Sequence, residues 1–98
     1  MQQGEAVTAA VAGVISAEVA HHVLWHYGSD DRAKVGYQPG AFTTKLMSAI
    51  AAADTVNRAR LYLGFPGYVA AHSLIEHSPD GVEILSRIAR GEVTPDDG

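Results

Sequence analysis

Residues 6–27 read AVTAAVAGVISAEVAHHVLWHY and form the longest hydrophobic stretch of the chain. No charge precedes Glu18 in this stretch, so about three helical turns pass without the polar stripe of a surface helix. The bulky face of such a helix holds Val7, Val11, Val14, Ile15, Val19 and Trp25. The small face holds Ala6, Ala9, Ala10, Gly13, Ser16, Ala17 and Ala20. The pattern predicts one long buried helix on which the rest of the chain packs.

Ionisable side chains within residues 6–27 argue against a membrane span. Glu18, His21, His22 and His26 would lie in or near the hydrocarbon, where charged groups are costly. No basic residue precedes the apolar stretch, as a signal peptide would require. We therefore expect a cytoplasmic protein that does not cross a membrane.

Composition favours one domain that uses apolar surface for a partner. The chain has 98 residues, of which 47% are hydrophobic and only 18% are charged. Its net charge of -4 argues against general nucleic-acid binding, which needs a basic surface. Cysteine is absent, which excludes disulfides, thiolate metal sites and cysteine nucleophiles.

Four further helices are expected after a loop at residues 28–40. Residues 41–53 repeat apolar side chains at helical spacing: Phe42, Leu46, Ala49, Ile50 and Ala53. Asp54 is the expected N-cap of a helix over residues 55–63, with Val56, Ala59 and Leu63 inward and Arg58 outward.

Helices are also expected over residues 67–77 and 79–90. The latter is expected to begin at a Ser78 cap and to end at Gly91, while Gly28 and Gly64 end earlier helices. The predicted fold is all-α: a compact bundle of four to five helices around the buried N-terminal helix. Residues 1–91 form the single helical domain, and residues 92–98 form a flexible acidic tail.

Histidine and glutamate side chains repeat at one-turn spacing in two places. Glu18, His22 and His26 are four residues apart along the first helix, and His72 and Glu76 share the same spacing. Side chains of this kind can bind zinc or another divalent metal if the two helices pack together. The favoured interpretation is that they form hydrogen bonds and ion pairs at the polar end of a bundle. A histidine pH switch is a further hypothesis.

Other chemistry has no recognisable motif. The chain lacks a Gly-x-Ser-x-Gly elbow, a phosphate loop and a dinucleotide fingerprint, so no enzyme activity and no cofactor are expected. The helices at 41–53 and 55–63 can be interpreted as a helix-turn-helix, with Arg58 and Arg60 on the recognition helix. The acidic net charge argues against this alternative.

Small and aromatic residues indicate a protein interface. The small helix face lets another backbone approach closely, either from this chain or from a second copy, and tyrosine is frequent at interface hot spots. The expected interface residues are Ala10, Gly13, Ala17, Tyr37 and Tyr68. Trp25 and Phe42 are expected to cap the core instead. The expected assembly is a homodimer.

Five short motifs resemble sequences in small, mostly uncharacterised proteins of actinobacterial phages, of the mycobacteriophage and Streptomyces-phage type. They are YQPG at 37–40, FTT at 42–44, NRARL at 57–61, LGFPGYVAA at 63–71 and PDG at 79–81. The resemblance covers a little over half the chain. It implies a phage origin and a place in the bacterial cytoplasm, and it carries over no catalytic residue.

The leading prediction is a non-enzymatic phage protein that binds a host or phage protein and modulates it. One alternative is a metal-binding protein or metalloenzyme that uses Glu18, His22, His26, His72 and Glu76. The other is a DNA-binding regulator that uses Arg58 and Arg60.

Overall fold

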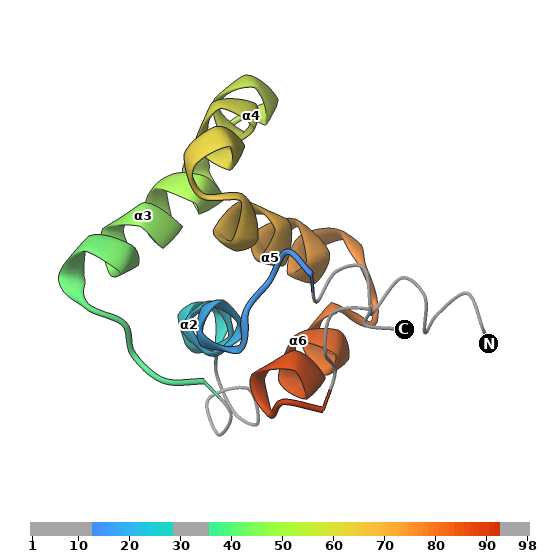
Figure 1. Ribbon diagram of the computed structural model, residues 1–98. Helices are drawn as coiled ribbons and strands as arrows, with labels where there is room; N and C mark the ends of the chain where they lie inside the picture. Colours follow the sequence, from blue (N-terminus) through green and yellow to red (C-terminus); the bar gives the residue numbers. More distant parts are fainter. Residues whose placement is uncertain (1–12, 29–35, 93–98) are drawn as a thin grey trace.

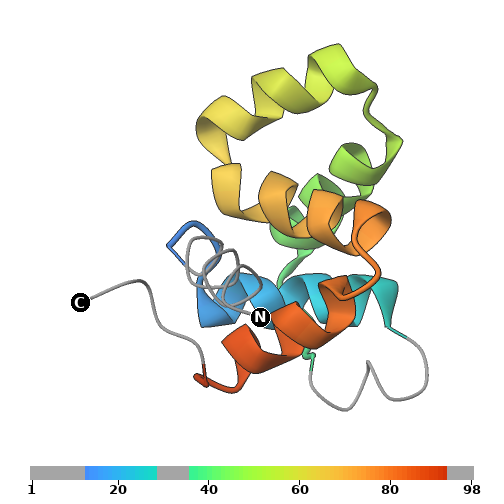
Figure 2. The same cartoon turned by 90° about the vertical axis from the view of Figure 1, so that its right-hand side faces the viewer.

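The computed structural model describes residues 13–28 and 36–92, which form five α-helices and no strand. These are α2 (Ala17–Tyr27), α3 (Ala41–Ala52), α4 (Thr55–Gly64), α5 (Pro66–His77) and α6 (Gly81–Ala89). α2 packs against α6, α5 and α3 at the centre of the bundle (Figure 1). α4 lies at the opposite end of the molecule from α2 and α6 (Figure 2). The predicted all-α bundle around an N-terminal helix is confirmed.

The first helix is shorter at its start than predicted. A turn precedes Ser16, whose side chain accepts a hydrogen bond from the Val19 N–H (3.1 Å), and α2 begins at Ala17. The prediction of one continuous helix over residues 6–27 is therefore wrong at residues 13–16. Glycine at position 13 is a poor helix former, and serine satisfies the free N–H groups of a new helix start. Residues 6–12 lie outside the described residues.

Two hydrophobic clusters hold the helices together. The main core, between α2, α5 and α6, buries Ile15, Ala20, Val23, Leu24, Met47, Ala71, Leu85, Ile88 and Ala89. A smaller core between α3 and α5 buries Leu46, Ile50 and Val69. Trp25 packs against the main core as predicted. Phe42 does not: its side chain is 68% exposed, because α3 meets the core only from Leu46 onward.

α4 is rotated relative to the prediction from its sequence. Val56, Ala59 and Leu63 were expected to face inward, but all three are exposed, and α4 contributes no buried residue. Arg58, expected to face outward, is instead half-buried against α5. The inward-facing prediction is wrong because Arg58 finds polar partners on α3 and α5, and these partners fix the rotation of α4.

Helix ends follow the expected chemistry with two exceptions. Asp54 caps α4 through the Asn57 N–H (2.8 Å), and Gly91 adopts a left-handed φ of 76° after α6, both as predicted. Gly28 is extended rather than left-handed, with a φ of -75°. Ser78 does not cap α6: its hydroxyl accepts from the Asp80 N–H (3.3 Å) and stabilises a turn, so α6 begins at Gly81.

The connections on both sides of α4 are very short. Phe65 is at once the C-cap of α4 and the N-cap of α5. Ala53 and Asp54 alone separate α3 from α4. No helix in residues 13–28 or 36–92 is long and apolar enough to cross a membrane.

Gly81 lies where α6 crosses the end of α5. A Cβ atom at this position would clash with the Leu74 carbonyl oxygen and lie 2.9 Å from the Ile75 Cα atom. Both neighbours are backbone atoms that cannot move aside. Gly81→Ala is therefore expected to lower the free energy of unfolding by about 1–3 kcal/mol, as measured by urea denaturation.

Gly64→Ala is the matched control for Gly81→Ala. No atom lies within 4 Å of a Cβ at Gly64, the last residue of α4. Alanine there is expected to leave the stability unchanged or to raise it by up to about 1 kcal/mol. Equal effects of the two substitutions would contradict the close packing of α6 on α5.

Candidate functional site

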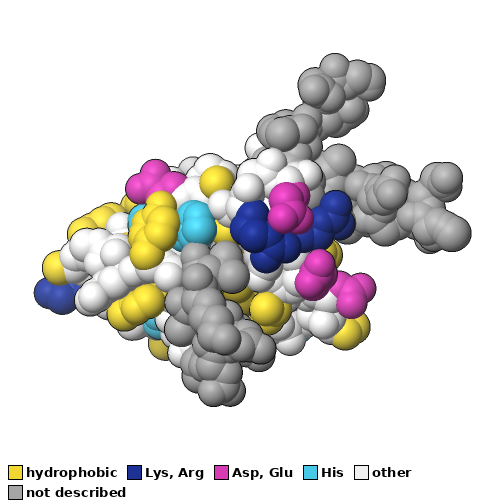
Figure 3. Space-filling view, turned by 90° about the horizontal axis from the view of Figure 1, so that it is seen from below, with side chains coloured by type: hydrophobic (Ala, Val, Ile, Leu, Met, Phe, Trp, Pro, Cys, Tyr) yellow, Lys and Arg dark blue, Asp and Glu magenta, His cyan; other side chains and the backbone are white. Residues whose placement is uncertain are grey.

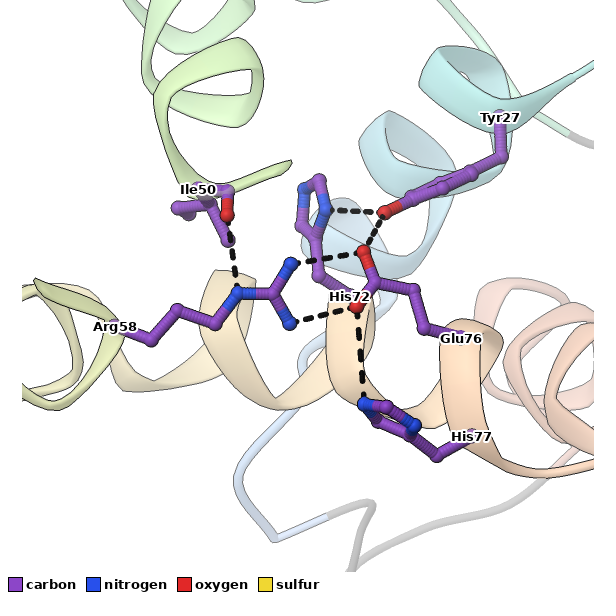
Figure 4. A network of polar contacts seen from close by, with 6 residues as sticks. All are labelled: Tyr27, Ile50, Arg58, His72, Glu76 and His77. Carbon is purple, nitrogen blue, oxygen red and sulfur yellow. Dashed lines mark hydrogen bonds and ion pairs between the residues drawn. The ribbon is translucent and has the colours of Figure 1, made fainter. Parts of the chain in front are cut away.

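A polar network joins α2, α4 and α5 next to the core. It consists of Tyr27, Arg58, His72 and Glu76, and we call it the Tyr27 network (Figure 4). The Tyr27 hydroxyl lies 2.7 Å from His72 Nδ1 and donates to Glu76 Oε2, also at 2.7 Å. A hydroxyl has one hydrogen, so with that hydrogen on Glu76 it accepts from His72 Nδ1–H. The network therefore fixes the neutral tautomer of His72.

Arg58 connects α4 to both neighbouring helices. Its two terminal nitrogens donate to the two oxygens of Glu76 at 2.7 and 2.8 Å, and its Nε donates to the Ile50 carbonyl at 3.0 Å (Figure 4). The Ile50 carbonyl lies in the last turn of α3, where it also accepts from the Ala53 N–H at 3.1 Å. The bonds from Arg58, and then the one from Tyr27, lower the pKa of Glu76 to about 2. Glu76 therefore stays ionised at neutral pH.

His72 is the most deeply buried member of the Tyr27 network. Its side chain is fully buried, and its Nε2 atom has no hydrogen-bond partner among the described residues. The His26 ring lies 5.4 Å from it, centroid to centroid. Burial, followed by the nearby His26, lowers the pKa of His72 to about 4. Burial also raises the pKa of Tyr27, with Glu76 acting in the same direction. At neutral pH the network thus contains one ion pair and two neutral rings.

A groove of about 750 Å³ runs between α4 and α5, beside the Tyr27 network. We call it the α4–α5 groove. It is lined by Ala53, Asp54, Thr55, Arg58, Ala59, Tyr62, Val69, Ser73, Glu76 and His77. Its volume is in the range of ligand-binding clefts. Glu76, one of these lining residues, is paired with Arg58 and remains ionised at neutral pH.

A second polar cluster surrounds His22 on α2. His22 Nδ1 lies 2.8 Å from the Tyr68 hydroxyl, and Tyr37 stacks on His21 with ring centroids 4.5 Å apart. Glu18 approaches His22 at 4.0 Å. Burial lowers the pKa of His22, and Glu18 partly opposes that change. Seen from below, histidine side chains reach the surface beside hydrophobic ones, and acidic and basic side chains lie close together (Figure 3).

The five predicted metal ligands belong to these two clusters. Glu18 and His22 lie with Tyr68, whereas His26, His72 and Glu76 lie around Tyr27. Within the part of the chain that the structure describes, no three His, Asp or Glu side chains are arranged to hold a metal ion. The predicted convergence of four or five ligands therefore does not occur. The favoured interpretation was hydrogen bonds and ion pairs at the polar end of a bundle; His72 and Glu76 form hydrogen bonds with Tyr27 and Arg58, and His72 lies buried beside the core.

The predicted interface residues have different environments. Gly13 and Ala17 are exposed, and Ala10 lies outside the described residues. Tyr37 is 48% exposed, with one side on His21. Tyr68 is partly buried and packs against both hydrophobic clusters, so it connects the two cores.

The two arginines of the DNA-binding alternative also differ. Arg58 is held by Glu76 and Ile50, so its guanidinium points toward α5 (Figure 4). Arg60 is exposed, and its Nη1 donates to the Asn57 side chain at 3.2 Å. The two side chains thus do not form one basic surface on α4.

Comparison with models of known families, with curated proteins and with solved structures gives no match to this chain. The candidate site therefore depends on the geometry alone. Its least expected member is Tyr27, to which the sequence pattern assigned no role. The one-turn spacing of His72 and Glu76 was the available signal for the site, because both side chains form a hydrogen bond with the same tyrosine hydroxyl.

Acid is expected to destabilise the protein through His72. The unfolded-state pKa of 6.5 lies above the folded-state pKa of about 4, so the unfolded state binds the proton first as pH falls. Between these two values the free energy of unfolding is expected to fall by about 3 kcal/mol on account of His72. Urea denaturation of the wild type and of His72→Phe, at neutral pH and at pH 4, measures the difference.

His77→Phe is the control for His72→Phe, because His77 is exposed. An NMR titration of the wild type gives a second readout, in which His72 stays neutral down to about pH 4. Equal pH dependence of His72→Phe and the wild type would contradict this role of His72.

Arg58→Ala is expected to loosen α4 without unfolding the bundle. The substitution removes charged hydrogen bonds worth about 1–3 kcal/mol from the contact of α4 with α5. Amide hydrogen exchange over Thr55–Gly64 is expected to accelerate, while α2 and α6 keep their protection. Arg60→Ala, at an exposed position, is the control. It is expected to leave the exchange rates of α4, α2 and α6 unchanged. Equal acceleration in all helices on Arg58→Ala would show that Arg58 supports the whole fold instead.

Proposed function

We propose that this chain is a non-enzymatic protein of an actinobacterial phage that binds a host or phage protein and modulates its activity. The phage origin and the place in the bacterial cytoplasm rest on the resemblance of residues 37–90 to phage proteins. The binding role rests on α4.

The observation that carries the proposal is the exposure of apolar side chains on α4. Val56 is 59% exposed, Tyr62 44% and Leu63 86%, and no residue of this helix is buried. Burying a Val or Leu side chain fully contributes about 1.5–3 kcal/mol. A partner that covers α4 therefore gains binding energy that the bundle itself leaves unused.

The chemistry of the α4–α5 groove supports a binding role over catalysis. Arg58 and Glu76 satisfy each other, and the low pKa of Glu76 keeps its carboxylate from acting as a proton donor. His72, the one neutral base of the network, is fully buried and does not line the groove, in which His77 is the lining histidine.

Leu63→Glu is expected to abolish capture of a partner from an actinobacterial lysate. The side chain is 86% exposed, so the substitution is expected to change the free energy of unfolding by no more than about 0.5 kcal/mol. A charge at this position would have to be desolvated on binding, so the partner is expected to be lost. Affinity capture with mass spectrometry, together with thermal unfolding, measures both effects.

Ala17→Glu is the matched control, because Ala17 is also exposed but lies on the small-residue face predicted for a homodimer. We expect this variant to keep the partner. Loss of the partner with Ala17→Glu but not with Leu63→Glu would move the interface to α2. A wild-type monomer that captures nothing would contradict the proposed function, and light scattering reports the oligomeric state.

A further inference from the structure

A second groove lies on the other side of α4, against the end of α3. We call it the α3–α4 groove; it has a volume of about 450 Å³. It is lined by Ala49, Ala52, Ala53, Asn57, Arg60 and Leu61. Half of these residues are alanines, which allow another backbone to come close.

The two most exposed large apolar residues of α4 flank Arg60 on the helix surface, and neither lines this groove. Val56 precedes Arg60 by four residues and Leu63 follows it by three, so all three side chains lie on neighbouring positions of one helix face. Val56 and Leu63 are 59% and 86% exposed. The α3–α4 groove and the helix face of Val56, Arg60 and Leu63 therefore meet at Arg60. We call the two together the Arg60 face.

Arg60 is the one charged group among the residues that line the α3–α4 groove. Its guanidinium donates to the neutral Asn57 side chain at 3.2 Å, and no carboxylate in residues 13–28 or 36–92 forms an ion pair with it. The other arginine of the helix, Arg58, is fully engaged by Glu76. The Arg60 face is therefore apolar and positive in a chain whose net charge is -4.

We propose that the Arg60 face binds an amphipathic helix of a partner protein that places a carboxylate on Arg60 and apolar side chains on Val56 and Leu63. This inference rests on the proposed function and names the partner's chemistry. An amphipathic helix that enters a groove presents anchors at one-turn spacing, which is the spacing of Val56, Arg60 and Leu63.

A second copy of the chain fits this face less well. A two-fold dimer places the same surface on both sides of the interface, so each copy brings its own Arg60 to it. The groove supplies no acidic residue to pair with that charge. An acidic helix from a different protein avoids the repulsion between two Arg60 side chains, and its carboxylate forms a charged hydrogen bond with Arg60.

Selection from a displayed library of helical peptides tests the proposal. The library fixes leucine anchors at one-turn spacing and randomises the positions between them. With the wild type, we expect the selected peptides to share Asp or Glu at one position beside the anchors. With Arg60→Glu, the same position is expected to switch to Lys or Arg, and wild-type binders are expected to bind about tenfold more weakly. Arg60 is exposed, so the variant is expected to keep the fold.

Three results would overturn the proposal. The first is that the selected peptides show no preference for Asp or Glu, or that no peptide is enriched above the level obtained with an unrelated protein. The second is wild-type binders that still bind Leu63→Glu. The third is retention of duplex DNA at low salt that Arg60→Glu removes, since Arg60 would then be a phosphate contact.

Lysate capture with Arg60→Glu separates this inference from the proposed function. If Leu63→Glu abolishes capture and Arg60→Glu leaves it unchanged, the chain is a protein-binding module but the acidic helix is excluded. If both variants lose the partner and the library shows the charge switch, both proposals are supported. If Leu63→Glu leaves capture unchanged, the proposed role of α4 in binding the partner is contradicted.

Discussion

The paired hydrogen bonds between Arg58 and Glu76 determine how α4 lies on the bundle. α4 has no fully buried residue, and its apolar contact with the smaller core is made by the partly buried Leu61. Arg58 adds a polar constraint, because its guanidinium reaches α5 through Glu76 and α3 through the Ile50 carbonyl. Once Arg58 faces inward, Val56 and Leu63 must face solvent. The exposed apolar surface thus lies opposite the side of α4 on which Arg58 bonds to α3 and α5.

The same ion pair reaches the centre of the fold through Tyr27. The tyrosine hydroxyl connects the ionised Glu76 to the buried, neutral His72, and α2 is thereby joined to α5 by polar bonds as well as by packing. A buried histidine is costly to charge, and a carboxylate held by arginine is costly to neutralise. The network is therefore stable over the range in which both groups keep these states.

Much of the fold could be predicted from the sequence, because helix starts and apolar spacing are local signals. Asp54 correctly predicted the start of α4, and the spacing of Leu46 and Ile50 correctly predicted the buried side of α3. The rotation of α4 could not be predicted in this way. Val56, Ala59 and Leu63 have the spacing of a buried stripe, but the Ile50 carbonyl and the distant Glu76 hold Arg58 in the inner position instead.

The candidate site could be predicted only in part from the sequence, for a similar reason. His72 and Glu76 stood out by their one-turn spacing, but the residue that joins them, Tyr27, is more than forty positions away in the sequence. Nothing local indicates that a tyrosine hydroxyl, rather than a metal ion, occupies the point where these side chains meet. Long-range contacts of this kind decide whether a histidine is a ligand or a hydrogen-bond donor.

The short connections of α4 have a mechanical consequence. Phe65 alone joins α4 to α5, and Ala53 and Asp54 alone join it to α3. A ten-residue helix spans about 15 Å, so a small turn at Phe65 displaces its far end by several ångströms. Linkers this short cannot extend enough to absorb such a displacement. Any force applied to α4 is therefore passed to α3 and α5 together, and the helix acts as a rigid lever between them.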